Sequence, residues 1–319
     1  MNAAVVHAFN APPRYTTFAD PVEAEGEKLV TVTAAALHPI VKSLANGTHY
    51  GSTGELPFIP GVDGVGRLED GTRVFFGVAR SPFGTFAERT LAPSWMCLPL
   101  PEGLDDATTA GIANPAMSSW AALTVRAKFV AGESVLILGA TGVSGQLSIQ
   151  IAKRLGARRV VAAGRNPEAL AKLKEFGADA VISLEQAPEA LVAAFRAEFD
   201  QGIDVVLDYL WGAPAEAALQ AIAKKGLKTT STRVRFVQIG SSAGANISLP
   251  AATLRSSGLE LLGSGFGSAS LSQISQAIAE FFQAAAQKPF AFSIKTVPLS
   301  EVEALWNEKE QATRLVFVP

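Results

Sequence analysis

The sequence is poor in the side chains that most often bind metal ions or form disulfides. Its 319 residues include one cysteine and three histidines. Cys97 alone cannot form an internal disulfide, and a zinc site built from cysteines only is equally excluded. This composition is typical of a protein from a reducing compartment, and we expect a cytoplasmic location.

An excess of basic residues and a long apolar segment are also missing. Lys and Arg number 27 against 29 Asp and Glu, so nucleic acid is not an expected partner. No charge-free apolar run approaches the roughly 18 residues that a membrane span needs. The N-terminus has neither the basic nor the apolar region of a signal peptide, and its pattern predicts a strand. We therefore expect neither a membrane span nor a secretion signal.

The rest of the sequence indicates two domains that differ in their pattern of strands and helices. At about 100–200 residues per domain, the length predicts two. Up to about residue 115 the sequence consists of short β-like stretches broken by Gly and Pro, which favours a mostly antiparallel barrel or sandwich. The clearest of these stretches are residues 28–35, 61–68 and 71–77.

From about residue 119 apolar strands alternate with helical segments. Continuous Val, Ile and Leu runs separated by helices predict a parallel sheet covered on both faces, the α/β doubly wound fold. The predicted strands are 134–138, 159–163, 180–183, 203–208, 234–239 and 259–262, and the helices between them include 146–155, 167–176, 188–198 and 214–224. A helix at 271–287 and strands at 292–297 and 314–318 follow, and we expect them to close the first domain.

The first predicted strand of this sheet leads into a glycine-rich loop. Residues 139–145 read Gly-Ala-Thr-Gly-Val-Ser-Gly, a dinucleotide-binding fingerprint with Ala140 in the first glycine place. Gly142 lets the backbone approach a pyrophosphate, and Gly145 lets helix and strand pack closely. A glycine-rich turn without a ligand is the alternative. The predicted cofactor-binding residues of the loop are Ala140, Thr141, Gly142, Val143, Ser144 and Gly145.

The end of the second strand favours NADPH over NADH. An NAD site usually carries Asp or Glu there, whereas this strand ends in Gly164, Arg165 and Asn166. Arg165 supplies a planar donor fork suited to a phosphate, although a solvated loop arginine is the alternative. We assign all three residues to the cofactor site, Asn166 most weakly, since Asn before Pro167 is also an ordinary helix N-cap.

Six segments distributed over the chain together resemble one family. They are residues 60–66, 71–74, 84–88, 140–145, 173–182 and 204–208. In these segments the chain resembles the medium-chain dehydrogenase/reductase superfamily, specifically its zinc-independent quinone oxidoreductase (zeta-crystallin-like) branch. The resemblance implies a GroES-like catalytic domain over residues 1–118, completed by 266–319, and a Rossmann domain over 119–265. It also implies a homodimer.

Zinc alcohol dehydrogenases of this superfamily have metal ligands at places that this chain fills differently. By motif match those places hold His38, Val62, Asp63 and Asn114. A catalytic zinc needs three protein ligands, and His38 with Asp63 supplies at most two. We therefore predict no metal. Without a Lewis acid to ionise an alcohol, reduction of an already polarised acceptor becomes the better assignment.

The resemblance also suggests which residues face the reaction. His38 stands where the branch usually has Asn near the nicotinamide, and Tyr50 stands where a Tyr lines the substrate pocket. Ser118 takes the place of a Thr whose hydroxyl faces the nicotinamide or substrate, and Asn114 offers an amide where zinc enzymes offer a thiolate. A structural histidine at a strand end is the alternative for His38, and an aromatic side chain in a surface loop is the alternative for Tyr50.

Ligands of such sheets bind at the carboxyl ends of the strands. Gly240 and Ser241 follow the fifth predicted strand, and Gly265 and Phe266 follow the sixth, so we expect these four to border the cofactor, with core packing as the alternative for Phe266. Asp208 ends the fourth strand, where it is expected to hold loop geometry rather than to act as an acid or base.

These observations predict an NADPH-dependent, metal-free oxidoreductase. The expected substrate is a quinone or an α,β-unsaturated carbonyl, whose β-carbon would accept the hydride while donors stabilise the enolate. A carbonyl or alcohol oxidoreductase is the enzymatic alternative. A cofactor-bound structural or regulatory protein, as in lens crystallins, is the alternative from another class.

Overall fold

The computed structural model describes residues 1–49, 51–223, 232–265, 267–308 and 313–319. The chain divides into two compact units. The first unit comprises Met1–Asn114 and Ala279–Pro319, and the second comprises Pro115–Ile278. The C-terminal segment thus belongs to the same unit as the N-terminal one.

The second unit contains a parallel sheet of six strands in the order β10-β9-β8-β11-β12-β13. β8 is buried at every residue, as the uniformly apolar pattern of a parallel strand requires. The chain passes from β8 to β9 on one side and later to β11 on the other, so the strand order reverses at β8. The predicted doubly wound sheet is confirmed. Its strands are β8 Ser134–Leu138, β9 Arg159–Gly164, β10 Ala180–Ser183, β11 Val205–Asp208, β12 Arg233–Gln238 and β13 Gly258–Gly263.

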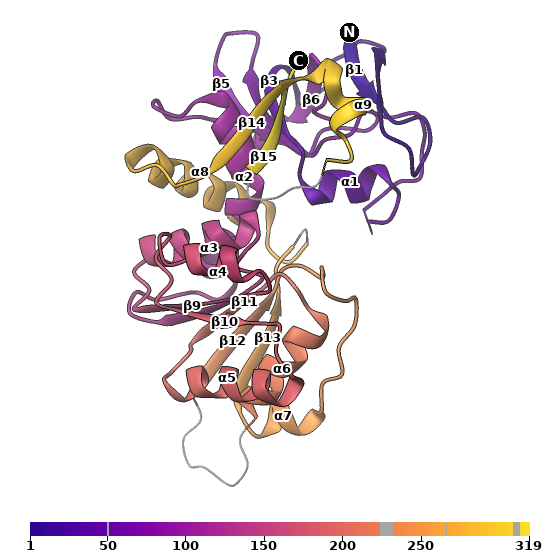
Figure 1. Cartoon of the computed structure of the whole chain (residues 1–319). Helices are drawn as coiled ribbons and strands as arrows, with labels where there is room; N and C mark the ends of the chain where they lie inside the picture. The colour runs from indigo at the N-terminus through magenta and orange to yellow at the C-terminus, as the bar shows by residue number, and fades with distance from the viewer. Residues whose placement is uncertain (50, 224–231, 266, 309–312) are drawn as a thin grey trace. The chain divides into compact units, whose positions relative to one another are not determined.

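Helices cover this sheet on both faces, with α3 and α4 on one side and α5 and α6 on the other (Figure 1). A buried cluster that includes Phe195, Leu219, Val206 and Phe236 joins α5 and α6 to the sheet. The helices are α3 Val143–Arg154, α4 Pro167–Lys172, α5 Pro188–Asp200, α6 Gly212–Ile222 and α7 Ala251–Arg255. α4 is shorter than predicted, because the chain leaves it in turns that end at Gly177 with φ 106°.

The first unit is built mainly from antiparallel strands. Its larger sheet has the order β14-β15-β3-β4-β5-β7, and β6 pairs with β3 outside this path. β14 and β15 form a parallel pair within it, and β15 pairs with β3. The strands are β1 Asn2–Val5, β2 Arg14–Thr17, β3 Glu27–Ala36, β4 Asp63–Arg67, β5 Arg73–Gly77, β6 Arg89–Pro93, β7 Leu98–Pro99, β14 Ser293–Pro298 and β15 Thr313–Val318.

Two long helices contain the points where the chain changes unit. α2 (Asp106–Ala121) runs through Pro115 and continues as a π-helix at Ala122–Arg126, and α8 spans Leu271–Gln287. α8 was predicted, whereas α2 was not, because the sequence pattern up to about residue 115 indicated only strands. The short helices α1 Pro39–Ala45 and α9 Val302–Leu305 complete the first unit.

Candidate functional site

The glycine-rich loop turns sharply at Gly139, immediately after β8. Gly139 has φ 88°, a left-handed conformation that favours glycine. The N–H groups of Gly139 and Ala140 both donate to the carbonyl oxygen of Ala163, at 3.0 and 2.9 Å. Gly139 therefore forms the tight turn, a role that the fingerprint assigns to the position of Ala140. Ala140 is fully buried instead. The signal in the sequence was Gly139 itself, the glycine that directly precedes Ala140.

Gly142 and Gly145 are required for different reasons. A Cβ at Gly145 would lie 2.4 Å from the carbonyl oxygen of Gly139 and 2.5 Å from the Cα of Ala140, so only glycine lets α3 approach the turn. A Cβ at Gly142 would meet a single atom, the Gly139 oxygen at 3.7 Å, and φ at Gly142 is an ordinary −77°. The fold thus tolerates a side chain at Gly142. The open space beside it is where a phosphate could approach the backbone.

The N-terminus of α3 faces this space without a side-chain cap, because its N-cap residue is Gly142. The first N–H groups of a helix have no intrahelical partner, and the helix dipole makes that end positive. The first turn carries no acidic residue, and Lys153 and Arg154 stand in the last turn. These features fit a pyrophosphate at the start of α3.

The end of β9 lies against the loop. A Cβ at Gly164 would be 2.5 Å from the Thr141 side chain, so this glycine permits the close approach. Arg165 is exposed beyond the strand. The side-chain oxygen of Asn166 accepts the N–H of Ala169 at 2.9 Å and caps α4. The structure therefore uses the Asn166 oxygen in the helix cap, which leaves Arg165 as the charged group suited to a phosphate.

Ser118 is connected to the glycine loop through Tyr209. Its hydroxyl donates to the carbonyl of Pro115 at 2.7 Å and lies 3.1 Å from the Tyr209 hydroxyl. The Tyr209 hydroxyl lies 2.8 Å from Ser148 Oγ, which donates to the carbonyl of Ser144 at 2.7 Å. Burial raises the pKa of Tyr209 above its ordinary value, and hydrogen bonds to serine hydroxyls oppose the rise. The sequence reasoning missed Tyr209, although it directly follows a predicted strand.

Asp208 shapes the turn that carries Tyr209. Its Oδ1 accepts the N–H groups of Leu210 and Trp211 at 2.8 and 3.0 Å, and Trp211 adopts a left-handed φ of 57°. Burial raises the pKa of Asp208 to about 6, and the two N–H bonds oppose that rise. These bonds confirm the prediction that Asp208 holds loop geometry.

In the first unit, three of the four residues at the metal-ligand places lie together. His38 follows β3, is fully buried, and has Nε2 3.4 Å from Asp63 Oδ1. Asn114, in α2, donates through Nδ2 to Asp63 Oδ2 at 3.3 Å. Burial lowers the pKa of His38; the nearby Asp63 opposes this shift, while Arg314 adds to it. Burial thus favours the neutral form of the His38 imidazole.

This cluster offers His38 and Asp63 as metal ligands, one fewer than a catalytic zinc needs from protein. Val62, beside Asp63, has no ligating atom. Within the described ranges, no three side chains of His, Cys, Asp or Glu form a group that could hold a metal ion. The donor set consequently does not fit a catalytic zinc site.

The remaining predicted residues lie after β12 and β13, or outside the described residues. The N–H of Gly240 donates to the carbonyl of Asp208 at 3.1 Å, and Ser241 beside it is exposed. Gly265 is exposed, and its N–H donates to Ser268 Oγ at 2.9 Å. Tyr50 and Phe266 lie outside the described residues.

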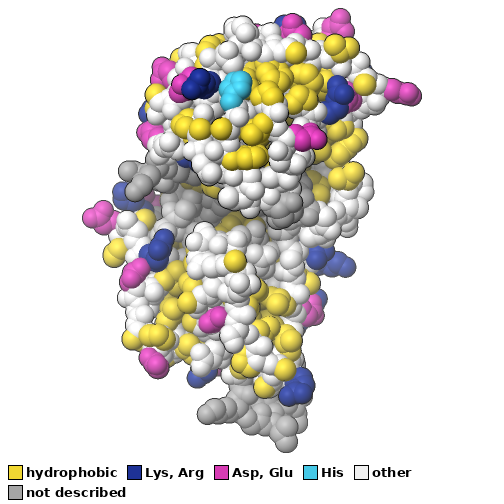
Figure 2. Space-filling view, turned by 90° about the vertical axis from the view of Figure 1, so that its right-hand side faces the viewer, with side chains coloured by type: hydrophobic (Ala, Val, Ile, Leu, Met, Phe, Trp, Pro, Cys, Tyr) yellow, Lys and Arg dark blue, Asp and Glu magenta, His cyan; other side chains and the backbone are white. Residues whose placement is uncertain are grey.

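In the part of the chain that the structure describes, no helix is long and apolar enough to span a membrane. On the face shown in Figure 2, Lys and Arg side chains are interspersed with Asp and Glu rather than gathered into one patch.

Comparison with known proteins defines the class. Residues 144–283 match the family described as "Zinc-binding dehydrogenase". The chain is 28% identical, over 100% of both sequences, to a protein from Emericella nidulans named "Probable NADPH-dependent quinone reductase". It is 30% identical to the chloroplastic NADPH-dependent alkenal/one oxidoreductase of Arabidopsis thaliana, over 54% of this chain and 50% of that one. The Thermus thermophilus quinone oxidoreductase, solved alone and with NADPH, matches with a TM-score of 0.79, 28% identity and 100% coverage of both chains.

These matches and the fold together identify the family. The chain is a medium-chain dehydrogenase/reductase of the quinone oxidoreductase type. The predicted fold class, a Rossmann sheet plus a GroES-like, mostly β domain, is confirmed.

Proposed function

We propose that the protein is an NADPH-dependent, zinc-independent oxidoreductase that reduces quinones or the C=C bond of α,β-unsaturated carbonyls. The observation that carries the proposal is the glycine loop, which is open at Gly142 and leads into the uncapped N-terminus of α3. The fold does not need glycine at that position, so a ligand that approaches the backbone explains it.

The residues of the loop fit a dinucleotide. Backbone N–H groups from Thr141 to Gly145 would hold the pyrophosphate, and Arg165 would pair with the 2′-phosphate that distinguishes NADPH from NADH. Gly240, Ser241, Gly265 and Phe266 would border the cofactor at the carboxyl edge of the sheet. When bound, NADPH supplies a hydride from its nicotinamide ring.

Residues of the first unit would stabilise the acceptor. Reduction of an enone adds a hydride to the β-carbon, moves the π electrons onto the carbonyl oxygen, and requires a proton at the α-carbon. Donors near that oxygen lower the barrier because they favour the developing negative charge. Asn114 keeps a second N–H besides the one that it donates to Asp63, and His38, whose Nε2 lies 3.4 Å from Asp63 Oδ1, is the other predicted donor. We assign the protonation of the enolate to Tyr50 or water.

The names of the relatives support this assignment. One is called an NADPH-dependent quinone reductase, another an NADPH-dependent alkenal/one oxidoreductase, and the Thermus enzyme was solved with NADPH. A quinone and an enone share the polarised C=C–C=O unit, so one site of this kind suits both. The two-ligand cluster at His38 and Asp63 supports the zinc-independent form.

The proposal extends to organisation and location. Residues 1–118 with 266–319 would form the catalytic domain, and 119–265 the dinucleotide-binding domain. The working protein would be a cytoplasmic homodimer, as implied by the resemblance and the reducing-compartment composition.

The test combines an activity assay with one glycine substitution. Purified protein should oxidise NADPH in the presence of a simple quinone or a short enone, followed by the loss of NADPH absorbance. Gly142→Ala should fold normally yet bind NADPH at least tenfold more weakly, because the methyl group occupies the space that the phosphate needs. Undiminished binding by Gly142→Ala, or tight NADPH binding by the unmodified protein without turnover of either acceptor, would contradict the proposal.

A further inference from the structure

A chain of hydroxyl contacts links the carbonyl of Pro115 to that of Ser144 through Ser118, Tyr209 and Ser148. These hydroxyls have one hydrogen fewer than the contacts need. Four contacts each need a hydrogen, whereas the hydroxyls of Ser118, Tyr209 and Ser148 supply three. Each serine donates to a backbone carbonyl in its own segment. The single Tyr209 hydrogen then faces the oxygens of Ser118 and Ser148, with the Ser119 hydroxyl also beside it, and can bond to one of them at a time.

The fold can release the hydrogen of Ser118, as it can that of Ser148, because each serine bonds to a carbonyl inside its own helix. Pro115 lies inside α2, where a backbone carbonyl already accepts the N–H four residues later. The bond from Ser118 to that carbonyl is therefore an additional one. If Tyr209 donates to Ser118 Oγ, that oxygen stays in place while its own hydrogen turns toward a ligand.

Tyr209 lies where three segments of the dinucleotide site meet. A Cβ at Gly139 would be 3.3 Å from the Tyr209 Cβ, and a Cβ at Gly240 would be 2.8 Å from the Tyr209 carbonyl oxygen. Its hydroxyl reaches Ser148 in α3, the helix that begins at the glycine loop. The residue thus contacts the turn after β8, the segment after β12 and α3 together.

We propose that Tyr209 is a positioning residue for the nicotinamide cofactor: its hydroxyl holds Ser118 so that the serine can hydrogen-bond the nicotinamide end of a dinucleotide bound at the glycine loop. The identity of the ligand rests on the proposed function. Ser118 touches the cofactor, and Tyr209 acts through Ser118.

The test removes one hydroxyl and compares binding with chemistry. Tyr209→Phe keeps the ring and deletes the donor, so the Kd for NADPH should stay within about twofold. The rate of hydride transfer to a quinone should fall about 3- to 10-fold, the loss expected for one hydrogen bond. The fluorescence lifetime of the bound nicotinamide should change as well. Tyr15→Phe, in β2 of the first unit, is the matched control and should behave as the unmodified protein.

A second variant separates positioning from general support of the fold. Ser118→Ala should lower the transfer rate, and adding Tyr209→Phe to it should cause no further loss. The proposal is wrong if Tyr209→Phe has the same effect with and without Ser118, or if folded Tyr209→Phe leaves both rate and lifetime unchanged. Failure of the proposed function would look different from failure of this proposal, because the unmodified protein would then reduce no acceptor. The fluorescence lifetime of bound NADPH would still test the role of Tyr209 in that case.

Discussion

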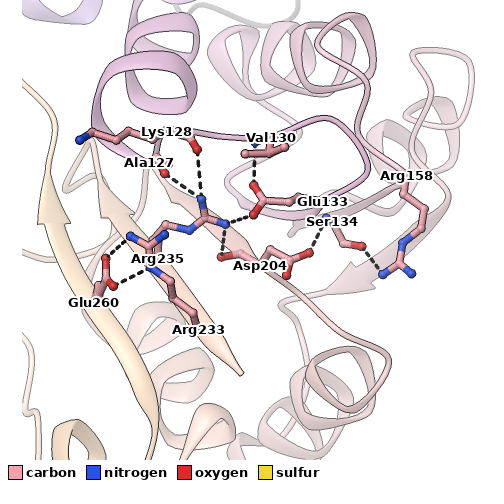
Figure 3. Close-up of polar contacts among 10 residues, drawn as sticks. All are labelled: Ala127, Lys128, Val130, Glu133, Ser134, Arg158, Asp204, Arg233, Arg235 and Glu260. Atoms are coloured by element: carbon pink, nitrogen blue, oxygen red, sulfur yellow. Dashed lines mark hydrogen bonds and ion pairs between the residues drawn. The ribbon is translucent and has the colours of Figure 1, made fainter. Parts of the chain in front are cut away.

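Two arginines on β12 make ion pairs of very different burial, and we predict that their removal has very different effects on stability. Arg235 is 2% exposed, and its guanidinium donates to the carbonyls of Ala127 (2.8 Å), Lys128 (3.4 Å) and Asp204 (3.4 Å) and to Glu133 Oε1 at 2.5 Å (Figure 3). It ties the segment before β8 to the sheet. The perturbation is Arg235→Met, which keeps most of the volume and removes every donor.

The neighbouring pair is the matched control. Arg233, two residues earlier on β12, forms a bidentate pair with Glu260 of β13 at 2.6 and 2.8 Å (Figure 3). Those side chains are 59% and 43% exposed, so water screens the pair. Arg233→Met should therefore change the free energy of unfolding very little, although Arg233 makes two contacts to one carboxylate.

The magnitude for Arg235 follows from the groups it would leave behind. Breaking a buried ion pair by removing one partner typically destabilises a protein by about 3–5 kcal/mol. Glu133 is 23% exposed and keeps a hydrogen bond from the N–H of Val130 at 2.9 Å, so we take the lower end, about 3 kcal/mol. Adding Glu133→Gln to Arg235→Met should recover part of this loss, because no unpaired charge then remains.

Hydrogen exchange followed by mass spectrometry reports on the second unit alone. Backbone amides in β11 and β12 should exchange on the order of 100-fold faster in Arg235→Met, the factor that corresponds to about 3 kcal/mol. The same amides in Arg233→Met should exchange at nearly the original rate. Equal rates in the two variants would refute the argument that burial decides the strength of these pairs.

Three further predictions concern the cofactor, the metal and pH. Arg165→Ala should weaken NADPH binding about 10- to 100-fold and NADH binding little, because it removes charge-assisted bonds to the 2′-phosphate; equal losses, measured by calorimetry, would argue against NADPH as the preferred cofactor. Exhaustive chelation should leave quinone reduction intact, and activity that is lost and then restored by zinc would exclude the zinc-independent mechanism. Asp208 has a folded pKa of about 6 against an ordinary 3.8, so the folded state binds more protons between these values and stability falls as pH rises through them, by about 3 kcal/mol. Asp208→Asn should remove this slope and be more stable than the original protein above about pH 6, and unfolding curves that keep the slope would show that another group causes it.

The parallel sheet could be predicted because its signals are local. The strand Ser134–Leu138 is apolar after its first residue, as a strand buried on both faces must be. The glycine loop could be found because Gly142 and Gly145 keep a fixed spacing between a strand and a helix. Both features depend on residues close together in the chain.

α2 could not be predicted, because it is buried on several sides at once. Three consecutive residues, Gly111, Ile112 and Ala113, are buried, which obscures the 3.6-residue period of an amphipathic helix. Pro115 in its interior further argues against a helix. This helix carries Asn114 and Ser118, so their surroundings became visible only in three dimensions.

The contacts of Tyr209 are equally inaccessible to local reasoning. Its hydroxyl partners Ser118 and Ser148 lie 91 and 61 residues away in sequence. The available signal was its place at the carboxyl end of a predicted strand, where ligands bind in sheets of this type. That signal marks a region and does not indicate which side chain reaches which partner.

The different demands on the two loop glycines make a useful reference protein possible. A chain with alanine at position 142 should keep the native fold and remain without dinucleotide at concentrations that saturate the original protein. A ligand that binds only the folded state stabilises it according to its concentration relative to Kd. The difference in unfolding free energy between the two chains, measured at a given NADPH concentration, would therefore give the stabilisation that the bound cofactor supplies at that concentration.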